Sequence, residues 1–291
     1  MKRLGFLAVA LTLGGCAAQA PVRAVGASPP TAGAIVPPGF QYLYGSGEAG
    51  AEQLTAYHAL IAYAREVVEH RPTNSVVLDE GSPLVHARFV PCGDKPFAAV
   101  FDVDETVLLN LGFEARAATG EPYSQAEWTR WEATGGDAVA AVPGAVHAVE
   151  DLRKMGVTVV FNTNRSAANA AATAAALKKA GLGDAVHRQT LFLQGDDNTG
   201  SLKDVRRWWI ADRYCVIAMA GDQLGDFSDL FNAPMPVAER RQLSVHSSAA
   251  GLWGKGWFVL PNPVYGTALK GGPDDVFPTD KRWAPAPAEE K

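Results

Sequence analysis

The sequence predicts an α/β fold: a Rossmann-like core with a central parallel sheet flanked by helices, plus a small, mostly helical accessory subdomain. Short apolar segments alternate with helical patterns between residues 96 and 260, and each segment is apolar throughout. Strands of this kind are typical of parallel sheets that helices cover on both faces. Polar residues directly follow three of the segments, at the sheet edge where open α/β proteins bind ligands.

Residues 1–16 are expected to form a targeting signal. Lys2 and Arg3 precede the apolar run Leu4–Leu13, and small residues then lead to Cys16. The run is too short to span a bilayer and fits a secretory signal. Because it ends on Gly-Cys, it resembles a bacterial lipoprotein signal, which implies a lipid anchor to the membrane through Cys16; plain secretion is the alternative. The expected location is the bacterial cell envelope, as an outer membrane lipoprotein or a periplasmic or secreted protein.

The folded part is expected over residues 40–270, which are long enough for one core with an accessory subdomain. Residues 17–39 are rich in Ala, Pro, Gly and Val and lack periodicity, which predicts a flexible tether. Residues 271–291 are rich in Pro, Gly and charged residues and predict a flexible tail. The core is expected at about 92–262, and the accessory helices at 45–75, 112–140 and in the C-terminal part.

The charge of the chain argues against a nucleic-acid polymer as partner. The formal net charge is −5, and removal of the signal with its two cations makes it more negative. The sequence contains no run rich in Lys and Arg, which binding to a phosphate backbone would require. An acidic protein can still bind a small phosphate ester if individual cations lie at the site.

Two cysteines remain besides the one in the signal. Cys92 and Cys215 each lie just before, or early in, a predicted strand. Export to an oxidising compartment would permit a disulfide between them. Two buried thiols are an equally open alternative, because the sequence supplies no geometry for the pair.

Local patterns define the first elements. A helical pattern ends before Pro72, and the segment Val76–Val90 is expected to be irregular with a turn at 81–83. The short apolar run Pro96–Val100 predicts the first strand of the sheet, ending at Asp102. The first helix is expected to bury Leu54, Tyr57, Ile61, Ala64 and Val68.

Start and stop signals divide the rest of the chain. Ser124 begins a capping box that opens a helix, and Pro143 suits the first turn of the next. Ser166 can cap an Ala-rich helix that ends at Gly181, and another helix is expected from about Ser201. The helix after Pro143 is expected to bury Val146, Val149 and Leu152. The other four strands are expected at Val157–Phe161, Thr190–Leu193, Tyr214–Ala220 and Trp257–Leu260.

Polar groups that are distant in sequence are expected to meet at one edge of this sheet. Asp102 and Asp104 follow the first strand, residues 162–165 follow the second, and residues 221–226 follow the fourth. Lys203 begins the helix before the fourth strand. A pair of carboxylates at such an edge can hold a divalent cation while one attacks an electrophile and the other moves a proton.

These elements resemble the four motifs of the haloacid dehalogenase (HAD) superfamily of phosphotransferases. More narrowly, the chain resembles the bacterial class C acid phosphatases, over roughly residues 40 to 270. The strings that carry the resemblance are FDVDETVL (101–108), WTRW (128–131), VPGAV (142–146), GDQLGDF (221–227) and LPNPVYG (260–266).

The resemblance implies a role for each aspartate. Asp102 is the expected nucleophile, which forms an aspartyl phosphate. Asp104 is the expected general acid and then the base for the attacking water. Asp102, Asp104 (through its backbone carbonyl) and Asp222 are the expected ligands of Mg²⁺, which prefers hard oxygen donors. Asp226 is expected to orient the metal site or Lys203 without being a metal ligand itself.

The resemblance also implies groups that contact the phosphate. Thr163 supplies a hydroxyl and Lys203 a fixed positive charge to the transferred phosphoryl group. Asn164 and Arg165 are candidates for phosphate or substrate contacts, with a purely structural role in the loop equally open. The family often has an acidic residue where Gly225 stands, and fewer basic residues surround Lys203 than expected.

Aromatic residues are the candidates for binding the organic part of the substrate. Trp128, Trp131 and Tyr265 can each stack on a nucleobase. The alternative is that both tryptophans pack the accessory helices onto the core. We expect one tryptophan in each role.

The predicted function is a Mg²⁺-dependent acid phosphatase that hydrolyses small-molecule phosphomonoesters, with nucleoside 5′-monophosphates as the expected substrates. A dehalogenase on the same fold would need neither Asp104 nor a metal, which argues against it. The non-enzyme alternative is an envelope-anchored binding lipoprotein on a HAD scaffold with little catalytic activity, but the acidic set is intact. A homodimer is compatible with the sequence.

Overall fold

The computed structural model describes residues 35–285. The predicted signal, Cys16 and most of the predicted tether lie outside these residues, as does the end of the predicted tail. All the elements described below belong to one compact unit within Val36–Lys291. Within residues 35–285, no helix has both the length and the apolar composition needed to cross a bilayer.

A five-stranded, wholly parallel sheet forms the centre of the unit, which confirms the predicted α/β fold. The strand order is β7-β6-β3-β8-β9, so the chain moves outward from the central β3 in both directions. The strands are β3 (Phe97–Phe101), β6 (Thr158–Ser166), β7 (Leu191–Gln194), β8 (Cys215–Gly221) and β9 (Trp257–Val259).

Alternate residues of the central strand enter two different apolar cores. Ala99 and Phe101 belong to one core, and Ala98 and Val100 belong to the other. Both faces of the sheet are therefore covered, which explains why the strands are apolar throughout instead of alternating.

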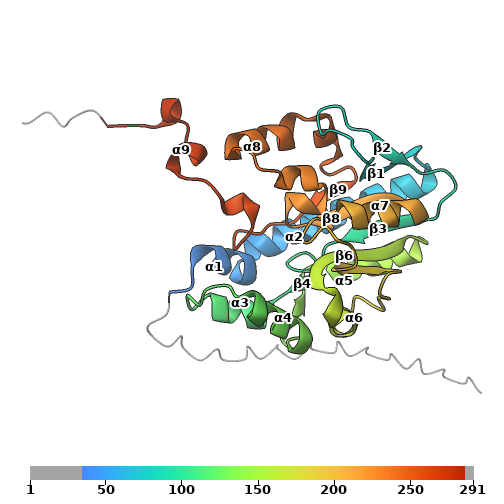
Figure 1. The fold of residues 1–291 in the computed structure, drawn as a ribbon, viewed down its shortest axis with the longest axis horizontal. Coiled ribbons are helices and arrows are strands. Elements are labelled where there is room, and N and C mark those ends of the chain that lie inside the picture. Colours follow the sequence, from blue (N-terminus) through green and yellow to red (C-terminus); the bar gives the residue numbers. More distant parts are fainter. Residues whose placement is uncertain (1–34, 286–291) are drawn as a thin grey trace, which may run out of the picture. The chain divides into compact units, whose positions relative to one another are not determined.

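Helices supply the opposite wall of each core (Figure 1). On the face of Phe101 lie α2 (Gly47–Glu69), α5 (Ala145–Lys154) and α6 (Ala170–Lys179). On the other face lie α7 (Asp204–Arg213) and α8 (Val237–His246). The remaining helices are α1 (Pro38–Gly45), α3 (Leu111–Ala117), α4 (Gln125–Thr134) and α9 (Pro273–Val276).

Two small antiparallel pairs complete the fold. The segment expected to be irregular contains β1 (Asn74–Leu78) paired with β2 (Phe89–Pro91), so that expectation is wrong. The pair forms because Val76, Val77 and Leu78 are buried in the second core. The other pair is β4 (Leu108–Leu109) with β5 (Ala140–Ala141).

Helix α2 is present as predicted, but its buried face is rotated from the predicted one. Tyr57 and Ala64 are buried as expected, whereas Leu54 is 41% exposed. Gln53, which is polar, lies on the buried side instead. Hydropathy alone predicts that Leu54 is buried. Packing of α2 against α5 instead buries the side of the helix that contains Gln53.

The helix starts predicted from the sequence are only partly confirmed. Ser124 caps α4 by accepting a hydrogen bond from the Glu127 amide, but the Glu127 carboxylate pairs with Arg116 and Arg130 instead of closing the capping box. Pro143 precedes the first turn of α5, because Gly144 occupies the N-cap position with a φ of 88°.

The other two predicted starts also shift. Ser166 caps a short 3-10 turn at residues 167–169, and α6 begins directly after that turn. Helix α7 begins at Asp204 instead of near Ser201. The Asp229 carboxylate accepts hydrogen bonds from the amides of Lys203 (2.8 Å) and Asp204 (2.6 Å). This long-range cap places Lys203 at the N-cap of α7.

Cys92 and Cys215 form a disulfide, with Cα atoms 4.5 Å apart. The bond joins the segment after β2 to the first residue of β8 across 123 positions of sequence. It therefore resolves the alternative that the sequence left open.

Helix α9 lies in the segment 271–291 that was predicted to be a flexible tail, and all its residues are exposed.

Candidate active site

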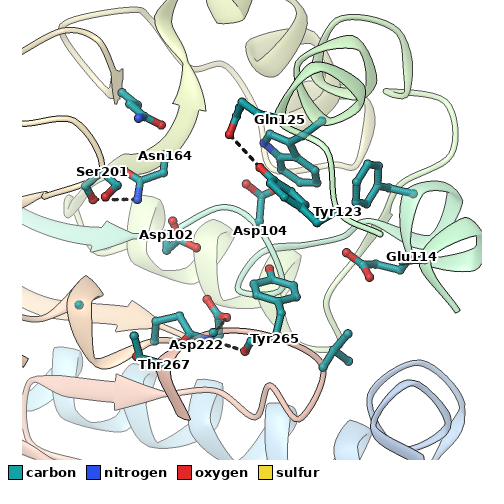
Figure 2. Close-up of a pocket in the computed structure, with 18 of the residues that line it drawn as sticks. Asp102, Asp104, Glu114, Tyr123, Gln125, Asn164, Ser201, Asp222, Tyr265 and Thr267 are labelled. Atoms are coloured by element: carbon teal, nitrogen blue, oxygen red, sulfur yellow. Dashed lines mark hydrogen bonds between the residues drawn. The ribbon is translucent and has the colours of Figure 1, made fainter. Parts of the chain in front are cut away.

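The carboxyl ends of three neighbouring strands meet at one cavity of about 860 Å³. Phe101 of β3 pairs in register with Phe161 of β6 and with Ala220 of β8. The next residues along each strand therefore lie side by side, and the Asp102 amide donates to the Ala220 carbonyl at 2.9 Å. Figure 2 shows side chains from these strand ends facing the same cavity.

Three buried carboxylates form a cluster among the residues that line the cavity. Asp102, Asp222 and Asp226 each place a carboxylate oxygen within 4.8 Å of the others. The Thr106 hydroxyl lies 3.5 Å from Asp102 and 3.2 Å from Asp222. The sequence therefore brings together two aspartates that are 120 positions apart, as predicted.

Lys203 supplies the positive charge nearest to the nucleophile candidate. Its Nζ lies 2.5 Å from Asp102 Oδ1 and 2.6 Å from Asp226 Oδ1. Burial alone would lower the pKa of Lys203, but the two carboxylates raise it above the ordinary value. The side chain therefore stays charged at neutral and acidic pH.

The cluster carries more negative charge than Lys203 can balance. Burial raises the pKa of Asp222 to about 7, and the charge of Asp226 adds to that effect. Burial also raises the pKa of Asp102, against the opposing effect of Lys203. Carboxylates in such surroundings are ionised most readily when a cation joins them.

The donor set fits a divalent cation of the Mg²⁺ type, because all its atoms are hard oxygens. Asp222 is oriented for this, since its Oδ2 accepts hydrogen bonds from Asn262 (2.7 Å) and Gln223 (3.0 Å). The three clustered carboxylates include Asp226 but not Asp104. Asp226 contacts Lys203, which agrees with its predicted orienting role, and its carboxylate also belongs to the cluster that could hold the cation.

Asp104 is held on one side only. Its Oδ1 accepts hydrogen bonds from Arg165 Nε (2.9 Å), Arg165 Nη2 (2.7 Å) and Asn110 Nδ2 (2.9 Å). Among residues 35–285 no group is hydrogen-bonded to Asp104 Oδ2. Asp104 lines the cavity, so the second oxygen is left for a proton exchanged with a substrate.

Other predicted residues lie behind the cavity wall. Thr163 is fully buried, and its hydroxyl accepts a hydrogen bond from the Arg165 amide at 3.1 Å. Arg165 is 2% exposed and pairs with Asp104. Neither lines the cavity, whereas Asn164 does while its amide donates to the Ser201 carbonyl at 2.9 Å. A direct contact of Thr163 or Arg165 with phosphate stays a prediction.

The two tryptophans have different surroundings. Trp128 lines the cavity and contacts Phe113 edge to face, with ring centroids 4.9 Å apart. Trp131 donates from Nε1 to Asn110 Oδ1 at 3.0 Å, and its ring covers Gly135 so closely that a Cβ there would clash. Tyr265, the third aromatic candidate, lines the cavity.

Sequence reasoning missed a buried carboxylate next to Asp104. Glu105 has a φ of 52° and accepts hydrogen bonds from the hydroxyls of Tyr44 (3.1 Å) and Tyr265 and from the Asn110 amide (2.9 Å). Burial raises its pKa to about 8. Glu105 belongs to the string FDVDETVL, but no local pattern predicts partners 61 and 160 positions away.

A family model shows which family the chain belongs to. The model for the HAD superfamily, subfamily IIIB (acid phosphatase), matches residues 49–268. The chain belongs to this family. It is therefore an acid phosphatase, a phosphomonoesterase of the HAD superfamily, and the recognition made from the sequence motifs is confirmed.

Solved structures support the fold of this acid phosphatase. The class C acid phosphatase from Bacillus anthracis is 20% identical with a TM-score of 0.64, and the similarity covers 79% of this chain and 84% of that chain. The same enzyme with tungstate bound gives 21% identity and a TM-score of 0.63, with 79% and 84% covered. No curated protein sequence matches the chain.

Proposed function

We propose that this acid phosphatase hydrolyses phosphomonoesters, with nucleoside 5′-monophosphates among its substrates, through an aspartyl phosphate on Asp102. The observation that carries the proposal is the position of Asp102. Its carboxylate lines the cavity, contacts Lys203 through Oδ1 and faces Asp222 across the Thr106 hydroxyl. A nucleophilic carboxylate is thereby placed between a fixed ammonium group and a candidate cation site.

Two in-line steps account for the hydrolysis. An Asp102 oxygen bonds to phosphorus while the bond to the leaving oxygen breaks, and Asp104 gives that oxygen a proton. Asp104 then takes a proton from a water, whose oxygen attacks phosphorus and releases Asp102 with inorganic phosphate. Lys203 stabilises negative charge on the phosphoryl oxygens in both steps.

Asp102, Asp222 and Asp226, with the predicted Asp104 carbonyl, would hold Mg²⁺. When bound, the cation supplies charge neutralisation to the phosphoryl group, and it permits Asp102 to approach a phosphate that is itself negative. Arg165 and Asn110 keep the Asp104 carboxylate oriented while the proton moves.

Nucleoside 5′-monophosphates are proposed because aromatic side chains line the same cavity as Asp102. Trp128 and Tyr265 both do so, while Trp131 is taken up by packing. Aromatic faces accept any nucleobase with little demand for a particular one. The geometry thus supports Trp128 and Tyr265 as the groups that contact the organic part.

A panel of phosphate esters tests the substrate and the metal together. We expect 5′-mononucleotides to exceed sugar phosphates and phosphotyrosine in kcat/KM. EDTA should reduce every rate at least about 100-fold, because the cation contributes several kcal/mol to the transition state. Added Mg²⁺ should restore the rates. Full turnover in EDTA would contradict the proposed metal dependence, and equal kcat/KM across the panel would contradict the nucleotide preference.

We further propose that Cys16, which lies outside the described residues, carries a lipid that anchors the enzyme in the cell envelope. The support is the signal-like segment 1–16 alone. Expression in a bacterial host with labelled palmitate should label the wild-type chain and leave the Cys16→Ser variant unlabelled. Equal labelling of both, or of neither, would contradict the anchor.

A further inference from the structure

The cavity extends beyond the catalytic carboxylates into a region lined by aromatic side chains. We call this region the aromatic lobe and define it by Phe113, Glu114, Tyr123 and Trp128. The Phe113 ring contacts Trp128 and Tyr123 edge to face, with centroids 4.9 and 6.5 Å apart. Figure 2 shows Tyr123 and Glu114 on the side of the cavity away from Asp102.

Glu114 is the unusual member of the lobe. It lies in α3 and is only 5% exposed, yet no group among residues 35–285 is hydrogen-bonded or ion-paired to its carboxylate. Figure 2 shows that carboxylate turned toward the interior of the cavity, in the direction of Tyr265. A nearly buried carboxylate without a protein partner is costly, and its oxygens remain accessible from the cavity, where a ligand can reach them.

The residues that line the cavity carry more negative than positive charge, which indicates that Glu114 faces a cationic ligand. Both basic side chains among the lining residues are already paired, Lys203 with Asp102 and Asp226, and Arg116 with Glu121 and Glu127. Burial and, to a smaller extent, the negative charge of Asp104 raise the pKa of Glu114 to about 7. The acidic lining residues are Asp102, Asp104, Glu114, Glu121, Glu127, Asp222 and Asp226.

We propose that Glu114 binds a protonated amine on the organic part of the substrate, so that of two phosphomonoesters of the same size and shape the enzyme prefers the one that carries such an amine. This rests on the proposed phosphatase function and adds amine-bearing esters to its proposed substrates. A protonated amine supplies the counter-charge that Glu114 lacks. The aromatic rings beside Glu114 add to the selection, because ring faces attract organic cations.

The role proposed for Glu114 is selection of the substrate and not chemistry. Glu114 is absent from the carboxylate cluster and from the hydrogen bonds of Asp104 and Lys203. Substitution of Glu114 should therefore change KM and the preference between substrates. It should change kcat little for esters whose organic part carries no charge.

A series of ω-aminoalkyl phosphates tests this proposal in the full-length enzyme with Mg²⁺. Each ester, with two to six carbons, is compared with the n-alkyl phosphate that has the same number of non-hydrogen atoms. The wild-type enzyme should favour the amine by about tenfold in kcat/KM at its best chain length, as expected for a hydrogen bond to a charged group. Most of this difference should lie in KM.

Two variants separate a direct contact from the general charge of the cavity. Glu114→Gln should bring the ratio to within about twofold of one while the n-alkyl phosphates keep their kcat. Glu121→Gln removes the same charge from an exposed, Arg116-paired position and should leave the ratio unchanged. A wild-type ratio of one or less at every length, or a preference that survives Glu114→Gln, would overturn the proposal. Failure of all the esters would instead contradict the phosphatase function itself.

Discussion

Replacement of Asp102 by Asn should reduce turnover of p-nitrophenyl phosphate at least about 10⁴-fold, the scale seen when a covalent nucleophile is removed. The amide keeps the size of the carboxylate but cannot form the acyl phosphate. Steady-state assays measure the loss. Brief reaction with ³²P-labelled substrate and acid quenching should label the wild-type chain and leave the variant unlabelled.

A matched variant controls for the general effect of exchanging an aspartate. Asp184 is 78% exposed at its side chain and lies outside the cavity lining, so Asp184→Asn should keep wild-type kcat. Far-UV circular dichroism should show that Asp102→Asn is folded. If a folded Asp102→Asn enzyme keeps even a tenth of wild-type turnover, Asp102 is not the nucleophile.

Reduction of the disulfide should substantially lower the free energy of unfolding. Cys92 and Cys215 close a loop of more than a hundred residues, and loops of that length correspond to about 3–5 kcal/mol of stabilisation. The melting temperature should fall by about 10 °C, since each kcal/mol shifts a domain of this size by about 2–4 °C. Guanidinium unfolding with and without dithiothreitol measures the difference.

The double variant Cys92→Ala/Cys215→Ala is the control for this experiment. It should melt near the reduced wild-type protein and should not respond to dithiothreitol. Both cysteines are buried, so the reductant should be added to unfolded chain before refolding. Identical midpoints for oxidised and reduced wild-type protein would show that the bond contributes nothing.

Residues at strand ends could be predicted because a single physical rule places them. Parallel strands in register put their carboxyl ends at one edge, and apolar runs mark where each strand stops. Asp102 and Asp222 therefore meet as expected, next to Lys203. The rule fails at β6, which continues through polar residues to Ser166, so that Thr163 and Arg165 belong to the strand and not to a loop after it.

Contacts between distant segments could not be predicted from local patterns. Asp229 sets the start of α7, and Glu105 joins Tyr44 to Tyr265, but neither carboxylate carries a local signal for these partners. The different surroundings of Trp128 and Trp131 also could not be predicted from local patterns. Which of two neighbouring rings packs on Gly135 depends on the shape of the assembled helices.

The sharing of one ammonium group by two carboxylates has a thermodynamic consequence. Because Lys203 contacts both Asp102 and Asp226, the three side chains are energetically coupled, and effects of single substitutions at these positions will not add. Loss of Lys203 leaves two buried charges to repel each other, which removal of either aspartate would partly relieve. Any apportioning of catalytic or folding free energy among the three therefore requires double-mutant cycles.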